Sequence, residues 1–173
     1  MKVTKLILSR GDLFENPITL VNADLPDRPL IYTNQLFRDS TKYDEASIIG
    51  KNCRFLQGAK TDYNAVQRVK NACNTHEPIC QDLINYTFTG ELFYNRLVLI
   101  PFKEQGINYV IGLQHVIPEE MFRPDHQADR PNLLDKTINP LAVMVALLIN
   151  PPEDLEPQLK KATRRIKEFV LSL

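Results

Sequence analysis

The sequence lacks the features that mark several broad classes of protein. Its 21 lysines and arginines balance its 21 aspartates and glutamates, so it has no excess positive charge with which to neutralise nucleic-acid phosphates. No apolar run reaches the roughly eighteen residues that a membrane span needs, and residues 1–10 are too polar for a signal peptide. It also has no glycine-rich phosphate loop, internal repeat or low-complexity stretch. These absences favour a globular protein without a membrane span, which we expect to be cytoplasmic.

Cysteine is scarce, with only Cys53, Cys73 and Cys80 in 173 residues. An odd number without C-x-x-C spacing argues against a disulfide framework and favours a reducing compartment. We expect Cys73 to occupy a core position on a helix and Cys80 to lie at a strand edge. The three histidines have no metal-ligand spacing, so we expect no metal site.

The chain does contain segments with clear strand and helix patterns. Alternating or β-rich runs bounded by turn residues predict five strands. These are Thr19–Val21, Leu30–Thr33, Gln81–Phe88, Glu91–Phe102 and Ile107–Val116. Thr61-Asp62 resembles a helix start, and apolar residues follow it with helical spacing. Because strands joined by short turns pair antiparallel, the order predicts an α+β fold with a five-stranded antiparallel sheet.

The segment after Ile117 differs from the sheet region. Residues 118–138 are polar and contain prolines, which predicts a linker. Asn139-Pro140 resembles a helix N-cap with proline at the first helical position, and the apolar run Leu141–Ile149 follows. A last helix is predicted from about Glu153 to the C-terminus.

That last helix has apolar residues at heptad spacing, and so short a seam must be buried against something to be stable. The seam residues are Leu155, Leu159, Ala162, Ile166, Phe169 and Leu173. Residues 139–173 therefore predict a helical hairpin that packs on its own sheet or on another subunit, and we expect a homodimer. The basic residues of this helix are offset by acidic ones, which indicates a solvated face and not a DNA-binding surface.

Three primary amides stand in otherwise apolar strand segments, at Asn85, Asn95 and Gln114. Strand alternation places each of them on the same face as apolar neighbours. A buried amide without partners costs about 1–3 kcal/mol, so something must satisfy all three. A carboxamide both donates and accepts hydrogen bonds, and the pyrimidine edge of a flavin needs that mixture.

The run Asn52-Cys53-Arg54-Phe55-Leu56-Gln57 resembles the signature of the LOV family, the flavin-binding blue-light receptors of the PAS superfamily. Further segments resemble motifs of that family over about Asn16–Val116. They include Leu25-Pro26-Asp27, Thr61-Asp62, Leu83-Ile84-Asn85-Tyr86-Thr87, Phe93-Tyr94-Asn95 and Ile111-Gly112-Leu113-Gln114. The resemblance implies a PAS fold, with helices on one face of the sheet and a C-terminal helical extension. It divides the chain into an N-terminal extension (1–15), a flavin-binding sensor domain (16–117), a linker (118–138) and a C-terminal hairpin for dimerisation or signalling (139–173).

The resemblance also implies roles for particular residues. Cys53 would be the thiol that forms a reversible adduct with the flavin C4a carbon, and it should be a neutral thiol in the dark. Arg54 would bind the ribityl phosphate, and Gln114 would be the hydrogen-bond switch at flavin N5. The flavin, expected to be FMN rather than riboflavin or FAD, would contact Asn52, Cys53, Arg54, Leu56, Gln57, Val66, Val69, Lys70, Leu83, Asn85, Asn95, Leu97, Gly112 and Gln114.

Two positions at the expected flavin site depart from the family pattern. Lys70 stands where many members have a second phosphate-binding arginine, and lysine retains the charge but lacks the planar fork. Leu97 stands where many members have a phenylalanine against the ring. The first departure leaves the choice between FMN and riboflavin slightly open.

The resemblance predicts a short LOV photoreceptor without a separate effector domain and without enzymatic activity. Its signal would pass through C-terminal helix packing or oligomeric state to an unknown protein partner. The alternatives are a PAS-type flavin redox sensor in which the Cys53 thiol is incidental, and a flavin enzyme. The enzyme is the weakest of these, because no general acid or base converges on the expected pocket.

Overall fold

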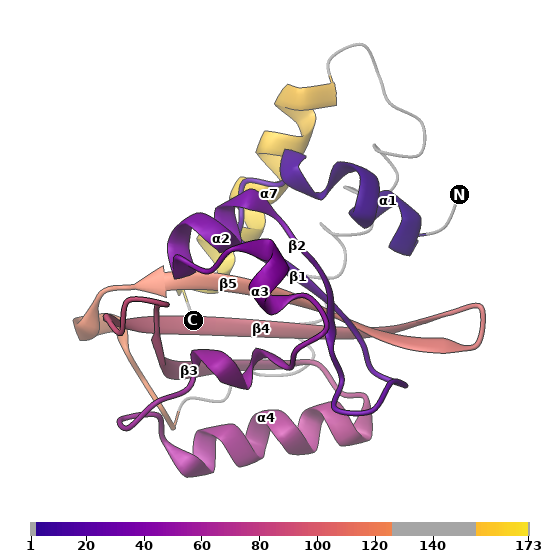
Figure 1. Ribbon diagram of the computed structural model, residues 1–173. Coiled ribbons are helices and arrows are strands. Elements are labelled where there is room, and N and C mark those ends of the chain that lie inside the picture. Colours follow the sequence, from indigo (N-terminus) through magenta and orange to yellow (C-terminus); the bar gives the residue numbers. More distant parts are fainter. Residues whose placement is uncertain (1–2, 126–154, 173) are drawn as a thin grey trace.

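The computed structural model describes residues 3–125 and 155–172, and its centre is a five-stranded sheet (Figure 1). The strands follow the spatial order β2-β1-β5-β4-β3, and every neighbouring pair is antiparallel. Their bounds are β1 (Ile18–Asn22), β2 (Leu30–Thr33), β3 (Ile79–Tyr86), β4 (Leu92–Glu104) and β5 (Ile107–Ile117). The predicted α+β fold with an antiparallel sheet is confirmed.

Helices between β2 and β3 cover one face of the sheet, here called the inner face. They are α2 (Gln35–Thr41), α3 (Glu45–Ile48), the 3-10 helix η2 (Cys53–Leu56) and α4 (Tyr63–Thr75). Each begins after a polar cap whose side chain accepts a backbone N–H of the first turn. The caps are Asn34, Asp44, Asn52 and Asp62. The helix start predicted at Thr61-Asp62 is therefore confirmed.

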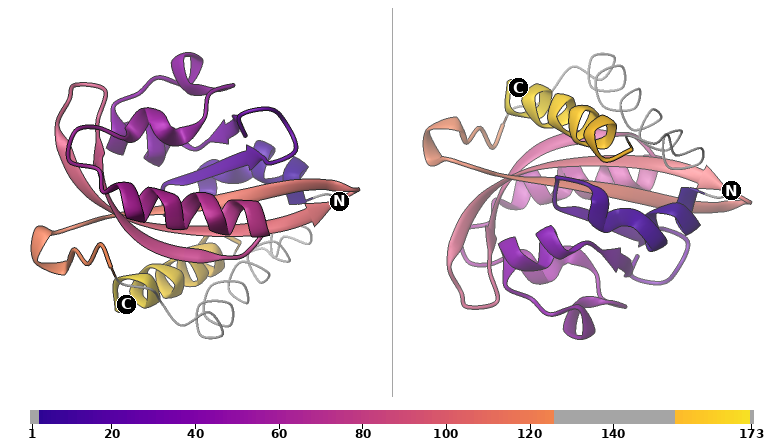
Figure 2. Two further views of the ribbon diagram at one scale, coloured as in Figure 1. Left: turned by 90° about the horizontal axis from the view of Figure 1, so that it is seen from below. Right: turned by 90° about the horizontal axis from the view of Figure 1, so that it is seen from above.

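The opposite face of the sheet, here called the outer face, is covered by the two ends of the chain (Figure 2). These elements are α1 (Val3–Arg10), followed by η1 (Gly11–Leu13), and α7 (Leu155–Ser172). Both helices contribute buried side chains to one apolar cluster with the sheet. Its members include Ile7, Ile18, Leu20, Val98, Ile100, Ile111, Leu113, Leu159, Ala162 and Ile166.

The apolar seam predicted for the last helix packs, in its described part, within the chain. Leu159, Ala162 and Ile166 are buried with residues of the sheet, and the buried Asn16 donates a hydrogen bond to the Thr163 carbonyl at 3.3 Å. The intramolecular packing that the sequence left open is thus present, while the homodimer remains a prediction. The predicted helix Leu141–Ile149 lies outside the described residues, as does most of the predicted linker.

A row of polar side chains crosses the apolar outer face. Asp82, Arg96 and His115 occupy neighbouring positions on β3, β4 and β5, and each is at most 4% exposed. The Arg96 guanidinium makes two parallel bonds to the Asp82 carboxylate, from Nε to Oδ1 at 2.7 Å and from Nη2 to Oδ2 at 2.9 Å. In the part of the chain that the structure describes, neither ring nitrogen of His115 has a hydrogen-bond partner.

The segment after β5 turns through η3 (Glu119–Met121) and returns to the sheet. Arg96 Nη2 donates to the Met121 carbonyl at 3.0 Å, and the Arg123 N–H donates to Asp82 Oδ2 at 2.8 Å. The buried ion pair thus has additional partners, as a stable buried pair requires. It also anchors the start of the predicted linker to the outer face.

Candidate functional site

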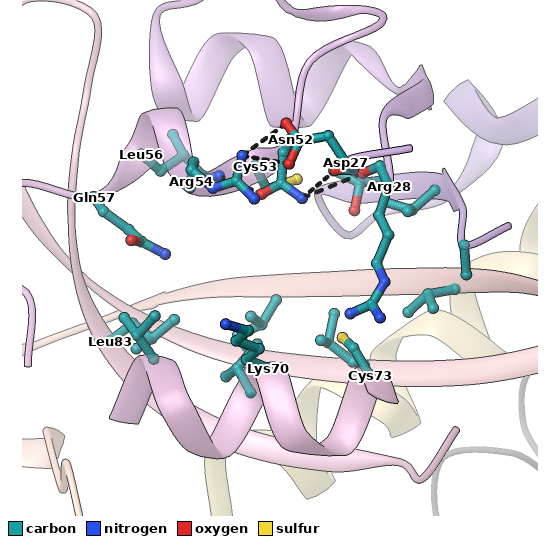
Figure 3. A pocket seen from close by; sticks show the side chains of 18 of the residues that line it. Asp27, Arg28, Asn52, Cys53, Arg54, Leu56, Gln57, Lys70, Cys73 and Leu83 are labelled. Carbon is teal, nitrogen blue, oxygen red and sulfur yellow. Dashed lines mark hydrogen bonds and ion pairs between the residues drawn. The ribbon is translucent and has the colours of Figure 1, made fainter. Parts of the chain in front are cut away.

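A cavity of about 750 Å³ lies between the inner face of the sheet and the helices that cover it (Figure 3). Its wall includes residues of β1, β3, β4 and β5, of the loop 23–28, and of η2 and α4. This volume is in the range of cofactor and small-molecule sites. The wall is mainly apolar with a limited set of amides and cations, which is the composition expected for such a site.

Asn52 positions the start of η2 in the cavity wall. Its Oδ1 accepts the Arg54 N–H at 3.0 Å, which caps η2, and its Nδ2 donates to the Asp27 carbonyl at 2.7 Å. The side chain therefore joins η2 to the turn of the loop 23–28. Cys53, the first residue of η2, faces the cavity as a consequence.

The Cys53 thiol is not activated as a thiolate. Burial raises its pKa from 9.0 to about 12, and the nearby Cys73 thiol contributes in the same direction. Its partial exposure is toward the cavity that it lines. This agrees with the expectation of a neutral thiol in the dark, and it differs from catalytic thiolates, whose pKa is lowered by basic neighbours.

Three strand amides meet at the sheet end of the cavity. Asn95 Nδ2 donates to Asn85 Oδ1 at 2.9 Å and to Gln114 Oε1 at 3.2 Å. All three side chains are at most 5% exposed. The residues come from β3, β4 and β5, so the antiparallel register assembles the amide group that the sequence predicted.

One atom of this amide group has no partner among residues 3–125 and 155–172. Asn95 Oδ1 is buried and accepts no hydrogen bond. A buried acceptor without a donor costs about 1–3 kcal/mol, so its presence points to a donor supplied by a ligand. A flavin pyrimidine edge has a ring N–H between two carbonyls, and the amides supply the complementary acceptors and donors. The residues therefore fit the flavin that the sequence resemblance implies.

Positive charge gathers where the loop 23–28 approaches α4. Arg54, Lys70 and Arg28 all line the cavity there. Arg54 forms an exposed ion pair with Asp27, with Nη1 and Oδ1 separated by 2.6 Å. A phosphate at this place would meet both of the cations expected from the sequence, Arg54 and Lys70.

The cavity wall contains every predicted flavin contact except one. It includes Asn52, Cys53, Arg54, Leu56, Gln57, Val66, Val69, Lys70, Leu83, Asn85, Asn95, Leu97 and Gln114. Gly112 is not among the wall residues, so its predicted flavin contact has no support from the cavity. A Cβ at Gly112 would lie 2.4 Å from Thr19 Oγ1 on the neighbouring strand, so the glycine makes room for Thr19, and Thr19 lines the cavity instead.

The sequence reasoning missed several residues of the wall. They include Thr19, Val21, Arg28, Cys73, Asn74, Leu99 and Val110. Strand alternation could have identified Val110, which lies four residues before Gln114 on β5, and helical spacing could have identified Cys73, three residues after Lys70. Cys73 was expected in the core. It is half-buried in the cavity wall. Cys80 lies near the start of the edge strand β3, as expected, and is buried on the outer face.

Other kinds of site have no support in the part of the chain that the structure describes. No group of three or more histidine, cysteine, aspartate or glutamate side chains is arranged to bind a metal ion there. None of the helices in residues 3–125 and 155–172 has the length and apolarity needed to cross a membrane. The cysteines at 53, 73 and 80 are free thiols.

Comparison with known proteins agrees with this geometry. The family model described as "PAS domain" matches residues 15–116. The chain is 41% identical over 102 residues to blue-light-activated histidine kinase 2 of Erythrobacter litoralis, which covers 57% of this chain and 30% of the kinase. The chain therefore spans less than a third of the length of that relative.

Solved structures extend the comparison to the fold. The LOV domain of the Erythrobacter litoralis EL346 blue-light-activated histidine kinase has a TM-score of 0.58 at 36% identity, covering 61% of this chain and 98% of that domain. The Rhodobacter sphaeroides LOV protein has a TM-score of 0.68 at 23% identity and covers 98% of this chain and 93% of its own, a likeness of fold. The chain belongs to the PAS family and, within it, to the LOV domains related to blue-light photoreceptors.

Proposed function

We propose that this protein is a blue-light photoreceptor that binds FMN in the inner-face cavity and responds through a reversible bond between Cys53 and the flavin. The observation that supports this most directly is that the neutral Cys53 thiol lies in the same cavity wall as an amide group with an unsatisfied acceptor. The proposed role is sensory and not enzymatic.

The flavin would supply absorption of blue light and, once excited, an electrophilic C4a carbon. Cys53 would add to it as a whole thiol, supplying the sulfur that bonds to C4a and the proton that N5 receives. No electron leaves the pair of reactants, so breaking the S–C bond and returning the proton restores the dark state. A thiol with a pKa raised to about 12 retains its proton until that step, which the addition requires.

Gln114 would report the change to the rest of the molecule. Flavin N5 accepts a hydrogen bond in the dark and donates one after the addition, and a carboxamide can rotate to follow the change. The next residue on β5, His115, points to the outer face, where α7 packs. Gln114 and His115 thus lie on opposite faces of the same strand. A change in the position of Gln114 would therefore act one residue away from the face on which α7 packs.

The output would be a change in how α7 packs, on its own sheet or in a homodimer. Light can shift that equilibrium only by the difference in stability that it creates between the packings. Size-exclusion elution in the dark and under blue light tests this part. An elution volume that light leaves unchanged at every concentration would refute the assembly change.

Absorbance of the purified, flavin-loaded protein tests the main proposal. Blue light should bleach the flavin band, and the band should recover thermally in the dark. Cys53→Ala should retain the flavin and lose the bleaching, whereas the control Cys80→Ala, which removes a thiol from the outer face, should retain it. Bleaching that survives in Cys53→Ala would instead favour the redox-sensor alternative.

A further inference from the structure

The side chain of Arg28 reaches across the cavity from the loop 23–28 toward α4 (Figure 3). Its Nη2 donates to Asn74 Oδ1 at 2.6 Å, and the two residues are 46 positions apart in the chain. The guanidinium is thus fixed at the cavity by one neutral hydrogen-bond partner. Burial raises the pKa of Cys73 on α4, and the positive charge of Arg28 partly opposes that rise.

Asn74 lies one helical turn after Lys70, and both residues line the cavity. Side chains four positions apart on a helix are neighbours, about 5–6 Å apart at Cβ. The hydrogen-bond partner of Arg28 thus lies one turn from Lys70 on α4, and both cations line the same cavity. The site therefore has three cations, Arg28, Arg54 and Lys70, whereas the family pattern implied two.

The carboxylates nearby do not neutralise Arg28. Asp27 is paired with Arg54 at 2.6 Å. Asp24 accepts hydrogen bonds from the backbone and side chain of Asn108, at 2.9 and 2.8 Å, and these lower its pKa. Among residues 3–125 and 155–172, no carboxylate forms an ion pair with Arg28.

The backbone of the turn explains why Asp27 and Arg28 have different partners. Both residues adopt left-handed conformations, with φ of 65° for Asp27 and 50° for Arg28. Two such residues in succession are uncommon outside glycine. The turn is stabilised by the Arg28 N–H to the Leu25 carbonyl at 3.0 Å and by Asn52 Nδ2 to the Asp27 carbonyl at 2.7 Å. It presents Asp27 to η2 and Arg28 to α4.

We infer that Arg28 is a third phosphate-binding residue, which selects flavins that end in a phosphate monoester over riboflavin. The inference rests on the proposed function and deepens it. A guanidinium donates two parallel hydrogen bonds to phosphate oxygens, which the Lys70 ammonium does not do. Arg28 supplies the planar guanidinium, with its two parallel N–H donors, that Lys70 does not provide. When a phosphate dianion binds, it becomes a partner of Arg28 in place of, or in addition to, the neutral Asn74 amide.

The test compares the affinities of the apoprotein for FMN and for riboflavin, measured by quenching of flavin fluorescence. Loss of one charge-assisted contact should weaken FMN binding about tenfold in Arg28→Gln. Riboflavin binding should change less than about twofold, because riboflavin has no phosphate for the guanidinium to bind. Arg28→Lys should fall between the native protein and Arg28→Gln. The control Lys51→Gln removes an exposed cation outside the cavity wall and should leave both affinities unchanged.

Two results would overturn the inference alone. One is an equal weakening of FMN and riboflavin, which would make Arg28 a structural link to Asn74. The other is an affinity for FMN that Arg28→Gln leaves unchanged. If the native apoprotein binds neither flavin, the proposed function fails as well. Riboflavin binding by Arg28→Gln also shows that the variant is folded, so misfolding cannot produce the expected result.

Discussion

Acidification is expected to destabilise this protein through His115. The imidazole is 4% exposed on the outer face, beside Arg96 and beneath α7, and neither ring nitrogen has a hydrogen-bond partner. Burial lowers its pKa from 6.5 to about 4. The Arg96 backbone beside the ring partly opposes this shift, and the positive charges of Lys167 and Arg96 lower the pKa further. The folded protein therefore holds His115 neutral at pH values where an exposed histidine is charged.

The sign and the size of the effect follow from these two pKa values. Between the folded and unfolded pKa, about 4 and 6.5, the unfolded chain binds the proton and the folded chain does not. Stability therefore rises with pH in this window and falls on acidification. At about pH 5 the unfolded imidazole is almost fully charged, and the folded one is mostly neutral. At about 1.4 kcal/mol per pH unit, moving from about pH 7.5 to pH 5 costs about 2 kcal/mol.

Urea unfolding at both pH values, in the native protein and in His115→Leu, measures this contribution. Carboxylates also titrate, but they do so in both proteins, so the difference between the two pH dependences isolates His115. The native protein should lose about 2 kcal/mol more than the variant. His115→Leu removes two unpaired buried nitrogens and should be at least as stable near neutral pH. The control His76→Asn, at an exposed left-handed position, should retain the native pH dependence. Equal losses in the native protein and His115→Leu would refute the reasoning.

Two further substitutions test the outer and inner faces of the sheet. Arg96→Met should lower the free energy of unfolding by about 3–5 kcal/mol, because it leaves the Asp82 carboxylate buried and unpaired. Adding Asp82→Leu should recover much of that loss in urea unfolding, and a double variant with strictly additive losses would contradict the buried-pair account. Asn95→Leu removes the unsatisfied Oδ1 and both donated hydrogen bonds, so the dissociation constant for flavin should rise about tenfold or more. A titration that shows unchanged affinity would mean that the flavin edge does not meet Asn95.

The sheet could be predicted from sequence because turn residues and alternation are local signals. The start of β3 shows their limit. The prediction began at Gln81, whereas the strand begins at Ile79. Gln81 and Asp82 are adjacent polar residues that are both buried, because Gln81 pairs with Arg68 of α4 and Asp82 pairs with Arg96. The residues that the prediction left out, Ile79 and Cys80, are adjacent and both apolar, so they give no alternating pattern that would mark the start of the strand.

Much of the cavity could also be predicted, because the run from Asn52 to Gln57 and the strand amides are short motifs. The missed residues depend on geometry that no motif records. The segment Leu25-Pro26-Asp27-Arg28-Pro29 indicates a turn, but it does not specify the two successive left-handed φ values that bring Arg28 to the cavity. Gly112 was assigned to the ligand because it belongs to a motif. In the structure, the Thr19 side chain occupies the space beside Gly112.

The covered outer face has a consequence for anyone who wishes to shorten this protein into a small flavin-based fluorescent tag. Ending the chain at Ile117 would remove Met121, Arg123 and α7 together. The outer face of the sheet would then expose aliphatic side chains to water, at a cost of about 25 cal/mol per Å² of apolar surface. Such an exposed apolar patch would promote aggregation. It would also deprive the ion pair of two backbone partners. A stable tag would have to keep α7 or replace the outer-face aliphatic residues with polar ones.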